Sequence, residues 1–216
     1  MSNTDSTTTD AEQRAVMADE ALRESERRFR YLFEQSPFSI QIYSPDGWAR
    51  KVNKAWEKLF GITLDMIKDY NILQDKQLRE KNLMSFIERG FAGEPTEIPA
   101  IKYDVSVEVP GASHIRWVRA FIYPVKDGNS ISEVILMHED VTSQKTAERA
   151  LRLLSKLTRR EYEIMELISE GQQNKQIASQ LNISIRTVEN HRANIMRKLH
   201  VRTVSQIVRI AIMAQG

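Results

Sequence analysis

The last sixty residues of the chain contain four short helical segments, marked by residues that start or end a helix. Two capping boxes mark helix starts, one at residues 158–161 and one at residues 203–206. Gly171 ends the first helix, and Ser184 is placed to cap the third. Only residues 181–184 separate the second helix from the third. This spacing predicts a helix-turn-helix, a unit that can place its second helix in the major groove of DNA.

The third of these helices has two distinct faces. Its apolar stripe is expected to pack in a core, and its polar stripe combines Arg, Glu and Asn with a small Ala. Arg can bond guanine, Asn can bond adenine, and Glu can accept from the cytosine amino group. We therefore predict contacts with DNA bases from Arg186, Glu189, Asn190 and Ala193. Contacts with DNA phosphates are predicted from Lys175, Thr187, Arg192, Arg197 and Lys198. The periodicity alone also fits a small helical bundle with no role in DNA binding.

The charge of the chain is unevenly distributed. Residues 155–216 contain ten basic and five acidic residues, a net charge of +5, which leaves −3 for residues 1–154. Basic charge concentrated in a small domain is typical of proteins that bind polyanions. A solvated basic surface is the alternative, and charge alone does not choose between them.

Residues 157–211 resemble the LuxR/FixJ-type helix-turn-helix output domain, a four-helix module. The resemblance lies in Leu157-Thr158-Arg159-Arg160-Glu161, Gly171-Gln172-Gln173-Asn174-Lys175-Gln176-Ile177-Ala178, Ile183-Ser184-Ile185-Arg186-Thr187-Val188-Glu189-Asn190-His191 and Lys198-Leu199. It implies base reading from the positions of Glu189, Asn190 and Ala193. The chain departs from the family pattern at Val204, where many members carry Arg.

Apolar seams on three helices predict a homodimer. The last helix is apolar on nearly all sides and must bury a second face, which members of the family bury against a twin. Residues 11–36 and 142–156 also carry apolar stripes at helical spacing. The predicted dimer interface consists of Val204, Ile207, Val208, Ala211, Ala147, Leu151, Leu154, Ala18, Leu22 and Phe29. Such a dimer would bind double-stranded DNA with a two-fold-symmetric site, and RNA polymerase is a candidate further partner.

The first two thirds of the chain have another pattern, so the predicted fold class is α+β. Five strand-like runs, at 38–43, 48–52, 97–107, 114–125 and 130–138, are separated by turn signals. Helical patterns at 53–60, 64–73 and 76–89 lie between the second strand and the third, which favours an antiparallel sheet with helices. The predicted organisation is a disordered leader over 1–10, an amphipathic helix over 11–36, a sheet domain over 37–141, a connecting helix over 142–156 and the helix-turn-helix domain over 157–216.

The order of these elements is similar to that of a PAS domain, a sensory α+β fold. The residues that carry the similarity are Tyr31-Leu32-Phe33-Glu34-Gln35-Ser36-Pro37, Asp46-Gly47, Val52-Asn53-Lys54-Ala55, Phe60-Gly61 and Glu139-Asp140-Val141-Thr142. The resemblance implies a dimerisation module that can hold a small ligand, and no ligand is identified. Candidate pocket residues are Ile40, Ile42, Trp56, Phe60, Phe86, Ile87, Trp117 and Met137, which would fill a dry core if no ligand binds.

Several classes of cofactor and function are disfavoured. The chain has no Cys, so it cannot form a disulfide, a flavin–cysteinyl adduct or a thioester-linked chromophore. The helix expected over 76–89 has no His to serve as an axial haem ligand, and His114 and His138 are expected on the surface or in strands. No motif supplies a nucleophile with its base, so an enzyme is not expected.

A cytoplasmic bacterial regulator, nucleoid-associated when bound to DNA, is the expectation, because no apolar run approaches the ~18 residues that span a bilayer. The expected mechanism is that a signal at the sheet domain alters the connecting helix around Ala147–Leu157. The alternative is an interaction adaptor whose DNA binding is controlled by a partner protein rather than by a small ligand.

Overall fold

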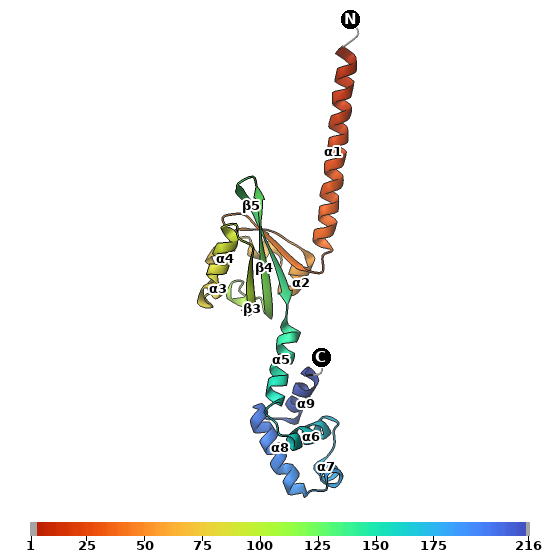
Figure 1. Cartoon of the computed structure of the whole chain (residues 1–216), viewed down its shortest axis with the longest axis vertical. Helices are drawn as coiled ribbons and strands as arrows, with labels where there is room; N and C mark the ends of the chain where they lie inside the picture. The colour runs from red at the N-terminus through yellow and green to blue at the C-terminus, as the bar shows by residue number, and fades with distance from the viewer. Residues whose placement is uncertain (1–3, 215–216) are drawn as a thin grey trace. The chain divides into compact units, whose positions relative to one another are not determined.

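The computed structural model describes residues 4–214 and separates the chain into two compact units, with the boundary between Asp140 and Val141 (Figure 1). The N-terminal unit contains a sheet of five antiparallel strands in the order β2-β1-β5-β4-β3. The strands are β1 (Ser39–Tyr43), β2 (Ala49–Val52), β3 (Thr96–Asp104), β4 (Ile115–Asp127) and β5 (Ser130–Asp140). The predicted α+β class is confirmed, and the first strand pairs with the last, Ile40 opposite Met137.

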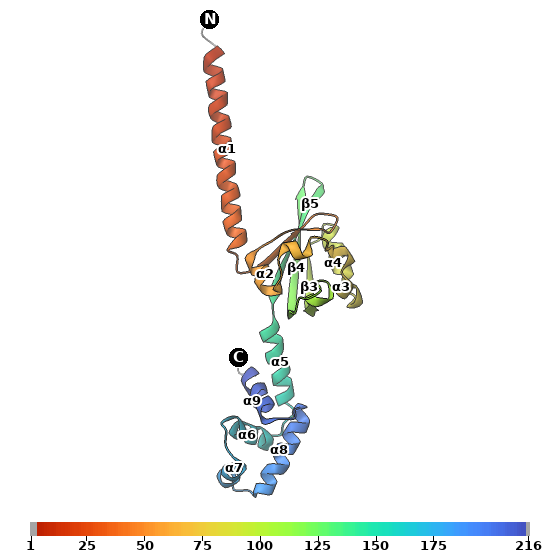
Figure 2. The same ribbon diagram turned by 180° about the vertical axis from the view of Figure 1, so that it is seen from behind.

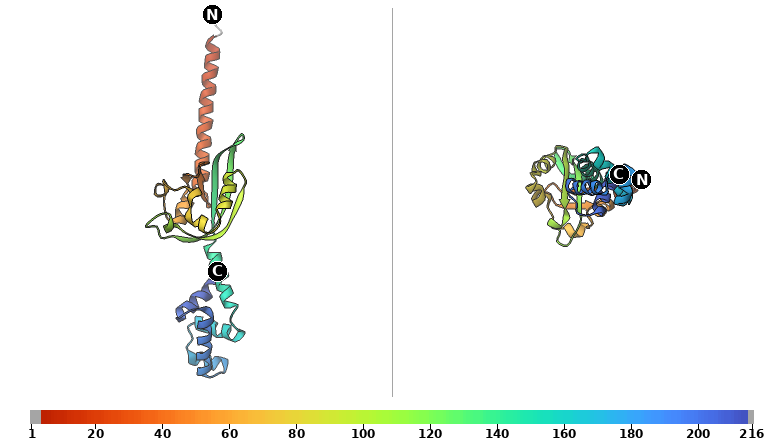
Figure 3. Two further views of the ribbon diagram at one scale, coloured as in Figure 1. Left: turned by 90° about the vertical axis from the view of Figure 1, so that its left-hand side faces the viewer. Right: turned by 90° about the horizontal axis from the view of Figure 1, so that it is seen from below.

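Short helices fill the chain between β2 and β3. They are α2 (Lys54–Phe60), the 3-10 turns η1 (Leu64–Ile67) and η2 (Ile72–Gln74), α3 (Lys76–Glu80) and α4 (Met84–Phe91), and a further 3-10 turn, η3 (Val105–Val107), follows β3. Helix α4 contacts β3, β4 and β5, and a view from the side of α3 and α4 shows both helices over the sheet (Figure 3). The core of this unit lies between the helices and that face of the sheet.

Two helix boundaries differ from the sequence prediction. The helix expected over 76–89 is divided into α3 and α4, because Asn82 adopts the left-handed conformation with φ of 58°. Gly90, which directly follows the helix expected over 76–89, instead lies within α4, where it is buried against Ile122 of β4. The absence of a side chain at position 90 thus permits close packing of helix on sheet rather than ending the helix.

Gly90→Ala is expected to lower the free energy of unfolding by about 1–3 kcal/mol, because added atoms in a packed core force displacement. A Cβ at this position would lie 2.4 Å from Cγ2 of Ile122, a fully buried side chain. Urea unfolding followed by tryptophan fluorescence measures the change, since Trp48, Trp56 and Trp117 all lie in this unit. The control is Ser85→Ala on the exposed side of α4. A Gly90→Ala protein as stable as wild type would contradict the close packing.

Helix α1 (Thr4–Glu34) precedes the sheet. The disordered leader predicted over 1–10 is therefore wrong for residues 4–10, while residues 1–3 lie outside the described residues. Extending an existing helix adds one hydrogen bond per residue without a new nucleation step, which favours continuation of α1 toward the N-terminus. At the other end of α1, the side-chain amide of Asn53 donates to the Phe33 carbonyl at 2.9 Å and so attaches the helix end to the start of α2.

The C-terminal unit is entirely helical (Figure 2). It consists of α5 (Thr142–Leu154), α6 (Arg159–Ser169), α7 (Asn174–Leu181), α8 (Ile185–Leu199) and α9 (Val204–Met213). Helix α5 contacts α8 and α9, and Leu154 joins the core formed by the other helices. The predicted connecting helix is thus part of this unit. None of the helices in the described part of the chain is both long and apolar enough to cross a membrane.

Candidate nucleic-acid interface

A sharp turn held by several hydrogen bonds joins α7 to α8. Asn182 ends α7 in the left-handed conformation, with φ of 51° and ψ of 50°, which Asn tolerates better than most residues. The Ile183 amide then donates to the Ala178 carbonyl at 3.0 Å. Ser184 caps α8 by accepting a hydrogen bond from the Thr187 amide at 3.0 Å, as its place in the sequence predicted. The predicted helix-turn-helix is present, and its turn is rigidly specified by local residues.

Arg160 also fixes this turn, and sequence reasoning missed that role. Its guanidinium donates to the carbonyl of Leu181, the last residue of α7, at 2.8 Å. A second nitrogen of the same group donates to Glu163 at 2.7 Å, which holds the side chain in place. Arg160 therefore connects α6 to the end of α7. No spacing rule could have found the contact, because the two residues are 21 positions apart.

Helix α8 presents a continuous polar stripe at the surface. Val188, Ile195 and Leu199 are buried in the core of the unit, as predicted from their spacing. On the other face, all four predicted base-contact residues and one predicted phosphate contact are exposed: Arg186, Glu189, Asn190, Ala193 and Arg197. The small Ala at the centre of the stripe would let the helix backbone approach the edges of base pairs.

The residues predicted to contact phosphates differ in their exposure and in their hydrogen bonds within the protein. Lys175 and Arg197 are exposed, and Arg197 donates to Asn194 at 3.3 Å. Arg192 and Thr187 are half-buried, and the Thr187 hydroxyl lies 2.8 Å from that of Ser184. Arg197 belongs to the stripe, Thr187 and Arg192 also lie on α8, and Lys175 lies on α7. Their positions are compatible with the predicted role.

The surroundings of Lys198 do not support its predicted role as a phosphate contact, because its side chain is paired within the protein. Its ammonium lies 2.6 Å from Oε2 of Glu161, whose side chain is 5% exposed. The same carboxylate accepts from the Thr158 amide at 2.8 Å and completes the predicted capping box of α6. Burial acts to raise the pKa of Glu161, but the hydrogen bonds from Lys198 and Thr158 outweigh it and lower the pKa. Lys198 is thus an internal partner of α6, because a buried carboxylate attracts the nearest cation.

The structure corrects part of the predicted dimer interface. Ile207, Ala211 and Leu154 are buried in the core of their own unit and are unavailable to a partner. Helix α5 packs on α9 and so covers a face that was expected to need a twin. On these two helices Leu151 and Val204 are exposed, while Ala147 and Val208 are half-buried. Sequence reasoning missed Ile212, which is 63% exposed.

The three predicted interface residues of α1 are all exposed. Ala18, Leu22 and Phe29 lie on the surface of the helix, and Phe29 stacks on Phe33 with the ring centroids 5.8 Å apart. The ammonium of Lys51 lies over the Phe29 ring, 5.8 Å from its centroid. An exposed apolar seam of this kind is compatible with the predicted pairing of helices.

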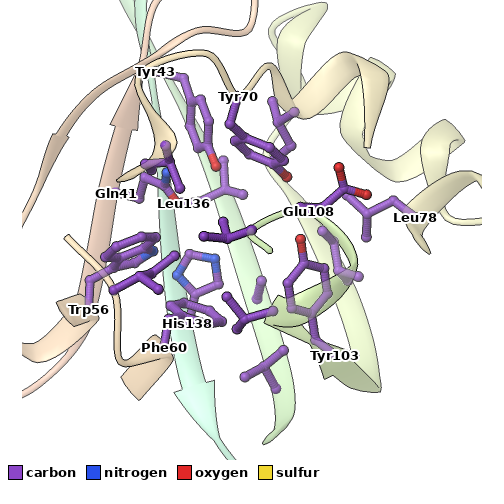
Figure 4. Close-up of a pocket in the computed structure, with 18 of the residues that line it drawn as sticks. Gln41, Tyr43, Trp56, Phe60, Tyr70, Leu78, Tyr103, Glu108, Leu136 and His138 are labelled. Carbon is purple, nitrogen blue, oxygen red and sulfur yellow. The ribbon is translucent and has the colours of Figure 1, made fainter. Parts of the chain in front are cut away.

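The N-terminal unit contains a cavity between its helices and the sheet, shown in Figure 4. Three of the eight predicted pocket residues, Trp56, Phe60 and Ile87, line it. The other five do not, which corrects the prediction for Ile40, Ile42, Phe86, Trp117 and Met137.

On β1 and β5, the predicted pocket residues lie on the wrong face of the sheet. Successive side chains of a strand point to opposite faces, so a shift by one residue exchanges the two sets. Gln41 and Leu136 are directly opposite each other on β1 and β5 and line the cavity, whereas Ile40 and Met137 form the adjacent pair. His138, expected on the surface or in a strand, lies in β5 and also lines the cavity. Polar residues thus occupy inward positions that the hydrophobic pattern assigned outward.

Comparison with known proteins identifies the C-terminal helices. The profile of the bacterial regulatory proteins of the luxR family matches residues 155–211. The uncharacterized response regulatory protein YgeK of Escherichia coli is 47% identical over 58 residues, 27% of this chain and 40% of YgeK. The transcriptional regulatory protein FixJ of Bradyrhizobium diazoefficiens is 38% identical over 72 residues, 33% of this chain and 35% of FixJ. This chain thus spans well under half the length of these curated relatives.

Among solved structures, the VqmA dimer of Vibrio cholerae is 21% identical, and the match covers 86% of each chain with a TM-score of 0.41. A TM-score this low supports no argument about the assembly of this chain. The sequence match and the capped turn between α7 and α8 agree on the same residues. Residues 155–211 are a helix-turn-helix domain of the luxR family of bacterial regulatory proteins.

Proposed function

We propose that this chain is a sequence-specific DNA-binding transcription regulator of the bacterial cytoplasm. The observation that carries the proposal is the exposed stripe of α8, in which Arg186, Glu189, Asn190, Ala193 and Arg197 share one face. Arg, Glu and Asn side chains can each bond a different base edge in the major groove. The capped turn and the Arg160 contact hold this stripe in one orientation, so little conformational entropy is lost on binding.

Electrostatics supports the same proposal. The C-terminal unit carries the net positive charge of the chain. If α8 lies in the major groove of DNA, Lys175, Arg192 and Arg197 would lie near the phosphate backbone that borders the groove. Phosphate contacts of this kind orient a protein on the duplex, while base contacts select the sequence. The assignment leaves Lys198 out, because that residue is paired with Glu161.

Selection from random duplex DNA by the purified full chain tests the proposal. The selection is run at about 150 mM salt, because phosphate contacts make affinity strongly dependent on salt. Enrichment of one sequence with two-fold symmetry is the expected result. Equal recovery of all sequences would contradict sequence-specific binding.

We further propose that the active species is a homodimer and that the N-terminal unit controls it. The exposed apolar residues Leu151, Val204 and Ile212 support an interface on α5 and α9, and the exposed seam of α1 supports a second contact. Because a two-fold dimer presents the same patch twice, it would bind two half-sites related by symmetry.

Leu151→Asp is expected to raise the dissociation constant of the dimer at least about tenfold, because it buries an unpaired charge in the proposed interface. Sedimentation equilibrium of the full chain measures the change. Leu151 is 55% exposed in the described chain, so the substitution leaves the core of the unit intact. Ile185→Asp, which alters a residue of similar exposure on α8, is the matched control and should leave the dimer unchanged. Equal dissociation constants for Leu151→Asp and wild type would exclude this interface.

A further inference from the structure

Most of helix α1 is not covered by the rest of its own chain. Every side chain from Val16 to Leu32 is exposed, so no described part of the chain packs on this stretch, whereas Phe33 at the end of the helix is buried. An isolated helix is marginal in water, because most helical stability in proteins comes from the packing of an apolar face. A long exposed helix of this kind is therefore expected to have a partner.

One stripe of α1 is suited to such a partner. Its residues, at alternating spacings of four and three, are Ala18, Leu22, Ser25, Phe29 and Leu32. This is the heptad spacing with which two helices pack side by side in a coiled coil. Val16 and Tyr31 are exposed apolar residues outside the stripe, and each has only charged or polar residues three and four positions away. They form no second stripe, so the partner is expected on one face of the helix.

The two flanks of this stripe carry opposite charges. The acidic flank contains Asp19 and Glu26, and the basic flank contains Arg14 and Arg28 with Ala21 between them. All five side chains are exposed, and neighbours on each flank are seven residues apart, the repeat of the stripe itself. Residues beside a coiled-coil seam set which partner binds and in which orientation. A helix with one acidic and one basic flank can therefore complement a second copy of itself.

The flank charges distinguish the two possible orientations of such a pair. In a parallel pair the basic flank of each helix faces the acidic flank of the other, so Arg14 lies beside Asp19 of the second copy, twice by symmetry. In an antiparallel pair like flanks face each other, and Asp19 would lie beside Glu26 of the second copy. Asp19 also pairs with Arg23 of its own helix at 2.8 Å, but this ion pair is exposed and therefore weak. The charges thus favour the parallel pair.

We propose that α1 pairs in parallel with α1 of a second copy of this chain, with the apolar stripe as the seam and Arg14 beside Asp19 across it. The inference rests on the proposed homodimer and adds to it the partner and the orientation of α1. The seam is short and contains Ala and Ser, so it supplements the proposed contact on α5 and α9 and does not replace it. A parallel pair starts both sheets from the same end of the paired helices, whereas an antiparallel pair would start them roughly 30 Å apart.

Cysteine cross-linking of the full chain tests the orientation, because the chain has no Cys of its own. In a parallel pair residue 18 faces its twin, within the Cα–Cα distance of about 4.4–6.8 Å that a disulfide requires. In an antiparallel pair centred on the stripe, residue 18 faces residue 29 of the second copy, and the two copies of residue 18 lie roughly 16 Å apart. Ala18→Cys is therefore expected to give a covalent dimer on mild oxidation, measured on a non-reducing gel. Glu20→Cys, on the exposed side of α1 opposite the stripe, is the matched control and should give little.

Ala21 gives a second test, in which the sign of the effect depends on the orientation. This residue would face Glu26 of the second copy in a parallel pair and Arg28 of the second copy in an antiparallel pair. Ala21→Lys is expected to lower the dissociation constant of the dimer about three- to tenfold, and Ala21→Glu to raise it by a similar factor. Ala21→Gln, which adds a side chain without charge, is the matched control. Sedimentation equilibrium of the full chain at about 0.05 M salt measures the constants, and the differences should shrink at about 1 M salt, where exposed charges are screened.

Three results would overturn the proposal. If the chain is dimeric in sedimentation but Ala18→Cys cross-links no more than Glu20→Cys, α1 does not pair with its twin, and the proposed homodimer stands without this contact. A cross-link between Ala18→Cys and Phe29→Cys chains, together with a tighter dimer for Ala21→Glu than for Ala21→Lys, would show that the pair is antiparallel. A chain that is monomeric at every concentration would refute the proposed homodimer as well.

Discussion

Replacing Lys198 with methionine is expected to lower the free energy of unfolding of the C-terminal unit by about 2–3 kcal/mol. The change leaves the buried Glu161 carboxylate without the ammonium that lies 2.6 Å away. Loss of one partner from a fully buried pair costs about 3–5 kcal/mol, and the 25% exposure of the Lys198 side chain reduces that figure. Hydrogen exchange of the backbone amides of α6 and α8 measures the loss within this unit.

The effect of Lys198→Met is also expected to depend on pH. The pKa of Glu161 is lowered from its ordinary value of 4.5 in the folded protein. A carboxyl group with a lowered pKa stabilises the folded state above its unfolded pKa, and this contribution is lost as the pH falls through the folded pKa. The difference between wild type and variant should therefore be full at neutral pH and shrink below about pH 4.5.

Two variants distinguish the ion pair from general effects of charge. Lys175→Met removes an exposed lysine of the same unit and should change the stability by less than about 0.5 kcal/mol. Adding Glu161→Gln to Lys198→Met should restore much of the loss, because an amide replaces the unpaired carboxylate and can still complete the capping box. A Lys198→Met protein as stable as wild type at neutral pH would show that the pair does not hold α6 and α8 together.

Asn190→Ala is expected to weaken binding to the selected DNA site by about ten- to a hundredfold, the value of one bidentate base contact. Asn190 is one of the exposed residues of the stripe on α8. The loss should concern one base pair in each half-site, so the variant should bind sites altered at that position as well as it binds the original. Fluorescence anisotropy titrations against the selected site and its single-base variants measure both effects.

Lys175→Ala is the matched comparison for Asn190→Ala. As a phosphate contact, Lys175 should contribute equally to every sequence, and its loss should reduce the salt dependence of binding by the equivalent of about one phosphate. The two variants are therefore separated by specificity rather than by affinity. Uniform weakening of all sequences by Asn190→Ala would contradict a base-reading role for this residue.

Local sequence signals were sufficient to predict the helix-turn-helix. The capping boxes of α6 and α9 and the cap at Ser184 depend on residues three positions apart, and all three are present in the structure. The exposed stripe of α8 follows from helical periodicity in the same way. These features were predictable because each is decided within one or two helical turns.

Features that depend on distant residues were not predictable. The pairing of Lys198 with Glu161 and the contact of Arg160 with Leu181 join different helices, and no spacing in the sequence indicates them. The face of β1 was assigned wrongly because Ile40 and Ile42 are apolar while the inward residue between them is Gln41. A rule that directs apolar side chains inward fails where a cavity carries polar groups.

Val141 alone separates the end of β5 from the start of α5. Its side chain is buried, and its backbone contributes only two soft torsion angles. A tether of many residues would let two modules diffuse independently, and its contour length would set how often they meet. A joint of one residue has no such contour length, and its freedom is limited to those two torsion angles. Inserting residues at this joint would add contour length, and that length would then set the freedom of the connection.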